Sequence, residues 1–220
     1  MNYFLHSAEM VGTAAFALSG ALLAIHKRMD LFGVIVLGVT TALGGGTIRD
    51  ILLGLTPPRM FYNYEYLTLA ALVSLALFLA VELSRGVVHR FKGWLYFVYV
   101  FSDALGLGIF SVAGTQVGID AGYEKIIFLC VFLGTATGVG GGILRDIMCG
   151  DIPFILKKHI YAVASIAGSI TFYLLFQAGL REMPVSLAGV AVTLITRLLA
   201  WHFHWNLPQA PVLEDEKTSV

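Results

Sequence analysis

The chain has 220 residues, of which 58% are hydrophobic and 13% are charged, and its formal net charge is zero at pH 7. Soluble domains carry about 25% charged residues, so this composition excludes an ordinary soluble domain, and the balanced charge leaves no basic surplus for nucleic acid. Long, non-alternating apolar runs predict an all-α polytopic membrane protein, because a helix of about 20 apolar residues spans a bilayer.

Seven runs are predicted to cross the membrane. They extend from about residue 5 to 24, 31 to 53, 64 to 83, 94 to 117, 126 to 148, 160 to 177 and 185 to 203. Residues 1–205 are therefore interpreted as one transmembrane domain. The polar segment 206–220 is interpreted as a short tail.

One motif occurs twice in these runs. The second span contains GGGTIRD at residues 44–50, and the fifth contains GGGILRD at residues 140–146, 96 positions later. Each copy is followed by a glycine and a proline at the same offsets, Gly54 with Pro57 and Gly150 with Pro153.

A second similarity extends the repeat. The pattern from Glu9 to Gly20 in the first span matches that from Asp103 to Gly114 in the fourth. Spans one to three (about 5–84) therefore correspond to spans four to six (about 94–178), and the seventh helix (about 183–204) lies outside the repeat. Three spans per copy require the copies to enter the membrane from opposite sides, which predicts inverted repeats.

The connector charges predict the orientation. The side that holds the N-terminus has three Lys or Arg residues, whereas the other side has eight, including Lys27, Arg28, Arg85 and Arg90. Cytoplasmic loops carry the excess of basic residues. We therefore expect the N-terminus outside and the C-terminal tail in the cytoplasm.

The triple glycines are expected to break their helices. Glycine costs a helix about 1 kcal/mol relative to alanine, and broken helices in inverted repeats form ion or substrate sites near the midplane. Close helix packing is the alternative, because small residues let helices approach. The residues predicted to form pore-lining kinks are Gly44, Gly45, Gly46, Gly140, Gly141 and Gly142.

The two Arg-Asp pairs are the most distinctive charges. Charges inside a membrane span usually face the bundle interior or water, although residues near a span end can also snorkel to the interface. Neighbouring residues point about 100° apart around a helix. Arg49 and Arg145 are therefore expected to seek partners on other helices rather than to pair with Asp50 and Asp146.

Two acids and several hydroxyls complete the candidate pathway. Glu9 and Asp103 occupy equivalent positions, and each is expected either to pair with an arginine of the motif or to line a cation path. The hydroxyls expected to line it are Ser19, Thr41, Thr47, Ser111 and Thr137. Arg197, in the seventh span, is expected to snorkel to the cytoplasmic interface.

Catalysis and cofactor binding are not indicated. The six histidines lie near span ends or connectors, and the sequence has no nucleophile elbow, phosphate loop or metal motif. We expect neither an enzyme nor a cofactor, and no structural metal, only transient potassium or sodium ions.

The duplicated G-G-G-x-x-R-D motif, the inverted three-span repeats and the extra seventh span resemble the prokaryotic TRIC family of trimeric intracellular cation channels, also labelled bacterial glycine transporters (UPF0126). The resemblance covers about residues 5–205. It implies a homotrimer in the bacterial inner membrane with one potassium-permeable pore in each protomer. In the family the kinked second and fifth helices flank that pore.

Two functions remain open on the sequence. The first is a passive monovalent cation channel, in which carbonyls and hydroxyls replace part of the ion's hydration shell. The second is a secondary transporter of glycine or a similar small solute, because inverted repeats suit alternating access equally well.

Overall fold

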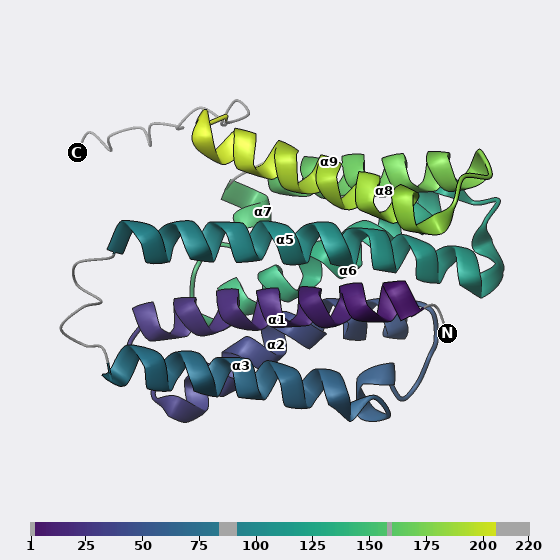
Figure 1. Ribbon diagram of the computed structural model, residues 1–220. Coiled ribbons are helices and arrows are strands. Elements are labelled where there is room, and N and C mark those ends of the chain that lie inside the picture. The colour runs from purple at the N-terminus through teal and green to yellow at the C-terminus, as the bar shows by residue number, and fades with distance from the viewer. Residues whose placement is uncertain (1–2, 84–91, 158–159, 206–220) are drawn as a thin grey trace, which may run out of the picture.

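The computed structural model describes residues 3–83, 92–157 and 160–205. Seven of its helices are long and apolar enough to cross a membrane, which confirms the predicted fold class (Figure 1). They are α1 (Tyr3–His26), α2 (Leu31–Leu52), α3 (Tyr64–Leu83), α5 (Lys92–Gly118), α6 (Ile127–Met148), α8 (Ile160–Gln177) and α9 (Glu182–His202). The predicted tail 206–220 and the connector residues Arg85 and Arg90 lie outside the described residues.

Short elements join these helices. A 3-10 turn, η1 (Arg59–Phe61), precedes α3, a π-helical turn, η3 (Ile119–Tyr123), extends α5, and α7 (Phe154–Lys157) lies between α6 and α8. The predicted ends of the spans agree with the helix ends to within about three residues. The agreement follows from the connectors, which contain the glycines, prolines and charges that stop apolar helices.

The two repeats pack together in opposite directions. Helices α1 and α5 lie side by side and run antiparallel (Figure 1). Their equivalent residues Phe16 and Phe110 stack with ring centroids 5.3 Å apart. The ring of Phe110 lies against Gly12, and the ring of Phe16 lies against Gly106, so each repeat provides a glycine for the other's phenylalanine. This cluster forms the centre of the core.

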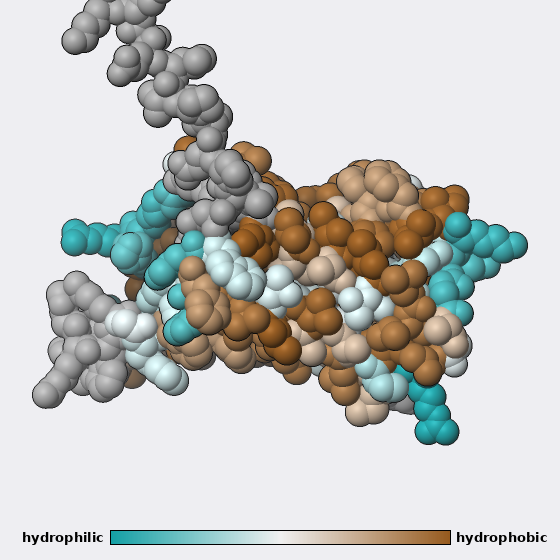
Figure 2. All heavy atoms as spheres, turned by 90° about the horizontal axis from the view of Figure 1, so that it is seen from above, coloured by the Kyte–Doolittle hydropathy of each residue, from teal (hydrophilic) through white to brown (hydrophobic). Residues whose placement is uncertain are grey.

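The outer surface of the bundle is apolar around its middle. Figure 2 shows hydrophobic side chains over the central part of the visible face and hydrophilic ones toward its ends. Helix α3 in particular exposes Leu67, Leu72 and Leu79. An apolar band between two polar ends is the surface that a bilayer covers.

Candidate functional site

Helices α2 and α6 cross at the triple glycines. The predicted break at these glycines is wrong, because both helices stay α-helical through the motif. A side-chain carbon at Gly45 would collide with the carbonyl oxygen of Thr137, and one at Gly141 with that of Thr41. The middle glycines therefore let the two backbones touch, as the packing alternative requires. We call this contact the glycine seam.

The three glycines of each motif face different surroundings. Gly44 and Gly140 pack against Leu144 and Ile48 of the opposite helix. A side-chain carbon at Gly46 would lie 3.7 Å from Arg49 Nη2, and one at Gly142 would lie 2.9 Å from the Tyr161 hydroxyl oxygen. The third glycine of each motif thus lies beside polar groups, one turn from its arginine.

Each arginine of the motif pairs with the aspartate next to it. Arg49 Nε donates to Asp50 Oδ1 at 2.9 Å, and Arg145 Nε donates to Asp146 Oδ1 at 2.9 Å. The prediction that neighbours would not pair is wrong, because the long arginine side chain curls across the angle between the two positions. All four residues are buried, so they do not snorkel to the interface.

Equivalent turns hold the other oxygen of each aspartate. Gly54 and Gly150 end their helices with positive φ values of 71° and 69°, the conformation that glycine adopts most readily. After the first turn the backbone N–H of Arg59 donates to Asp50 Oδ2 at 2.9 Å. After the second, the N–H of Phe154 donates to Asp146 Oδ2 at 2.8 Å. The repeated glycine and proline after the motif thus orient the aspartate.

The Arg145 cluster consists of Ser19, Asp103, Arg145 and Asp146. Arg145 Nη1 donates to Asp103 Oδ1 at 2.5 Å and to Ser19 Oγ at 2.7 Å. Of the two roles expected for Asp103, the structure thus shows pairing with an arginine of the motif. The Arg145 side chain is fully buried. Its guanidinium lies 5.4 Å from the ring centroid of Tyr99 and 5.5 Å from that of Phe154. Two rings therefore close this cluster from solvent.

The Arg49 cluster consists of Glu9, Arg49, Asp50 and Tyr66. Of the two roles expected for Glu9, pairing with an arginine of the motif or lining a cation path, the ion pair does not form among the described residues. The Tyr66 hydroxyl instead donates to Glu9 Oε2 at 2.9 Å, and His6 Nδ1 lies 2.9 Å from the Tyr66 oxygen. The cluster lines a pocket of about 100 Å³ at the end of the bundle where α1 begins.

The predicted hydroxyls take different positions. Thr41 and Thr137 donate to backbone carbonyls of their own helices, and Ser111 bonds Leu107 O and Ser165. Ser19 reaches the Arg145 cluster, and Thr47 lines the pocket beside Arg49. Only these last two of the five predicted hydroxyls meet the charged clusters or the pocket.

Three residues near the clusters were not predicted from the sequence. Tyr66 belongs to the Arg49 cluster, and the Tyr99 ring lies over the Arg145 guanidinium. The Arg197 guanidinium lies 5.1 Å from the centroid of the Tyr161 ring. Arg197 is 3% exposed, so the prediction that it snorkels is wrong. Tyrosine is common near span ends, and no spacing rule separates these three from the other tyrosines.

Comparison with known proteins identifies the family. A family model described as Glycine transporter matches residues 6–82 and 100–177, one match in each repeat. The UPF0126 inner membrane protein YadS of Escherichia coli K12 is 42% identical over 91% of this chain and 93% of its own. A UPF0126 membrane protein of Vibrio cholerae is 37% identical, and the match covers 93% of this chain and 82% of that protein.

Solved structures agree with the sequence relatives. A TRIC cation channel is 35% identical, covers 96% of this chain and 98% of its own, and superposes with a TM-score of 0.80. A TRIC orthologue from Rhodobacter sphaeroides is 30% identical, with a TM-score of 0.81, and the match covers 91% of this chain and 98% of that protein. The family is one of channel- or transporter-like proteins and is not an enzyme family. The chain is therefore a membrane protein of the TRIC family, whose family model is described as Glycine transporter.

Proposed function

We propose that the chain is a monovalent cation channel, permeable to potassium, with a pathway along α2 and α6 in each protomer. The charge along this pathway carries the proposal. Each repeat contributes two carboxylates and one guanidinium, namely Glu9, Asp50 and Arg49 in the first and Asp103, Asp146 and Arg145 in the second. Pairing with one arginine leaves one negative charge in each repeat when all groups are ionised. Acidic groups of this kind favour cations over anions.

The pathway has three parts in this proposal. The pocket at the Arg49 cluster forms the first part, the glycine seam the second and the Arg145 cluster the third. The hydroxyls of Tyr99 and Tyr161 and Asp103 Oδ2 are buried with no hydrogen-bond partner among the described residues. Buried polar atoms are usually satisfied, so these atoms suit a passage for hydrated ions.

The described conformation represents the closed channel. The backbones of α2 and α6 touch at Gly45 and Gly141, which leaves no passage between them. Opening requires the two helices to separate there and Arg145 to leave Asp103. Because the seam has no side chains, separation exposes backbone carbonyls, which can replace part of an ion's hydration shell.

The assembly and orientation are part of the proposal. The R. sphaeroides relative is a trimeric channel, and three copies of this chain would give three pathways in the lipid bilayer. The excess of basic connector residues supports a cytoplasmic C-terminus. The Arg49 pocket then faces the periplasm.

A carrier of glycine or a similar small solute is the second candidate. The description of the family model favours it. A zwitterion needs one site for its carboxylate and one for its amine, and the Arg49 cluster holds both charge signs. Its pocket of about 100 Å³ has room for only a very small solute.

Current recording in planar bilayers separates the two functions. A channel gives unitary potassium currents with no glycine present, and its reversal potential in a KCl gradient follows potassium rather than chloride. A carrier gives glycine counterflow in vesicles and no unitary currents. Counterflow without such currents would contradict the channel.

A further inference from the structure

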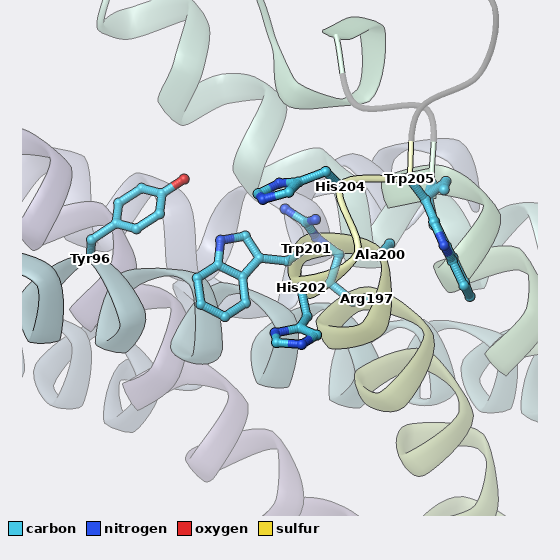
Figure 3. Close-up of a pocket in the computed structure, with 8 residues that line it drawn as sticks. Tyr96, Arg197, Ala200, Trp201, His202, His204 and Trp205 are labelled. Atoms are coloured by element: carbon cyan, nitrogen blue, oxygen red, sulfur yellow. The ribbon is translucent and has the colours of Figure 1, made fainter.

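We infer that a second pocket, whose lining residues differ from those of the pocket at the Arg49 cluster, binds the phosphate group of an anionic ligand. This pocket has a volume of about 490 Å³ and lies where α5 and α8 begin and α9 ends. Figure 3 shows Arg197 extending from α9 toward His204, with Trp201 and Trp205 on either side. We call it the Arg197 pocket, and its lining includes Tyr96, Arg197, Trp201, His202, His204 and Trp205.

Arg197 is a buried cation with no counter-charge in the part of the chain that the structure describes. Its side chain is among the most buried of the charged residues, at 3% exposed. Its Nε has no hydrogen-bond partner among the described residues, and none of the described carboxylates lies within ion-pair distance of it. The guanidinium rests on the Tyr161 ring, which attracts it but carries no negative charge to neutralise it. Because removing an uncompensated charge from water is costly, the site is suited to an anion.

The other lining side chains add donors rather than competing acceptors. His202, His204, Trp201 and Trp205 all carry ring N–H groups, and the described lining contains no aspartate or glutamate. A phosphate offers several oxygens to such donors, and the planar guanidinium binds two of them at once. The chemistry of the pocket therefore fits a phosphate group.

The position of the pocket fits an interfacial ligand. Tyr96 and Trp201 lie with ring centroids 6.4 Å apart, and Trp205 is 49% exposed just beyond the end of α9. Tyrosine and tryptophan gather at the level of lipid headgroups. Both a phospholipid headgroup and free inorganic phosphate carry the required group. The inference does not depend on the proposed permeation function.

Binding to the full-length protein tests the inference. In nanodiscs of phosphatidylcholine, the number of phosphatidylglycerol molecules retained by each protomer is counted by native mass spectrometry, and inorganic phosphate is titrated separately. Loss of a charge-assisted hydrogen bond weakens binding about tenfold or more, which is expected for Arg197→Gln. Arg28→Gln removes an exposed arginine at the same end of the bundle and should leave binding unchanged.

The two arms identify the source of the phosphate. Retention of one phosphatidylglycerol that inorganic phosphate does not displace indicates a lipid headgroup, and saturable binding of inorganic phosphate alone indicates a soluble anion. Trp205→Ala changes only the exposed rim of the pocket and should weaken binding about threefold or more. If Arg197→Gln does not fold, this variant tests whether the ligand binds in the pocket. Absence of binding in both arms, or binding unaffected by either pocket variant, would overturn the inference.

Discussion

Arg49 and Arg145 occupy equivalent positions in the two repeats but have different surroundings. Arg145 is fully buried, pairs with Asp103 and Asp146, and lies beneath two aromatic rings. Arg49 pairs with Asp50 and lines a pocket at the opposite end of the bundle. Inverted repeats that take up different arrangements give a pathway that is open at one end and closed at the other.

This asymmetry predicts different access to equivalent positions. Thr47 lines the pocket, whereas its equivalent Ile143 packs against the central cluster of the core. Thr47→Cys should therefore react with a membrane-impermeant thiol reagent, and Ile143→Cys should react at least about tenfold more slowly when the channel is closed. Labelling of spheroplasts from the periplasmic side, followed by a gel-shift assay, measures both rates.

The native cysteines give a low background in this assay. Cys130 is buried. Burial, followed by the nearby Asp151, raises the pKa of the Cys149 thiol above its ordinary value, so little reactive thiolate forms at neutral pH. The unsubstituted protein is the control. Equal labelling of the two new cysteines would contradict the asymmetry, and labelling of Thr47→Cys only in inverted vesicles would reverse the proposed orientation.

The buried pair of Asp103 with Arg145 should dominate the stability of its cluster. Asp103→Asn leaves a guanidinium that is fully buried with one carboxylate instead of two. Breaking a buried pair typically costs about 3–5 kcal/mol, so the thermal midpoint in detergent should fall clearly. Glu9→Gln is the matched variant in the other repeat, and it should cost less than about 1 kcal/mol because Glu9 is only partly buried.

The same two variants test the role of the acids in conduction. Each removes one negative charge from the proposed pathway, so each should lower the permeability ratio of potassium to chloride, measured from reversal potentials. A wild-type ratio in both variants would show that the acids serve only packing and stability.

The spans could be predicted because membrane insertion depends on local composition. About 20 apolar residues mark a spanning helix, and the connectors mark its ends. The predicted bounds of the sixth span, 160–177, are the same as the observed bounds of α8. The inverted relation of the repeats also followed from the sequence, because three spans per copy leave no other arrangement. The path of α2 and α6 through the triple glycines could not be predicted, because the helix on the other side of the seam decides it.

The site was only partly predictable, because contacts between helices decide the partners of its side chains. The depth of Asp103 predicted either an arginine partner from the motif or a place on a cation path, and the structure shows the pairing, with Arg145. Glu9 takes Tyr66 instead of Arg49, because a hydroxyl from α3 reaches it. Arg197 stays buried because the Tyr161 ring on α8 covers it. These two departures, at Glu9 and at Arg197, come from a side chain on another helix, which sequence spacing does not reveal.

The stacked rings of Phe16 and Phe110 should close the passage beside the Arg49 pocket. Phe110 lines that pocket and also belongs to the central cluster of the core. Phe110→Ala should cost about 3–5 kcal/mol and raise the basal potassium leak from liposomes. Phe172→Ala removes a buried ring from a different cluster, so it should lose at least as much stability without the leak. Equal leaks from both variants would indicate general loosening of the bundle.

The glycine seam predicts a sharp difference between neighbouring positions. Gly45→Ala places a methyl group against the Thr137 carbonyl, where backbone must move to make room. Gly46→Ala places the same group 3.7 Å from the nearest atom, Arg49 Nη2, in ordinary contact. Both substitutions raise helix propensity by about 1 kcal/mol. A difference in thermal midpoint or gating between the two variants therefore comes from the contact at the glycine seam. Gly45→Ala should force α2 and α6 apart, which lowers the thermal midpoint and raises the open probability in single-channel records. Gly46→Ala should keep or raise the midpoint and leave gating near wild type. If the two alanines behave alike, the contact of α2 with α6 at Gly45 does not hold the channel closed.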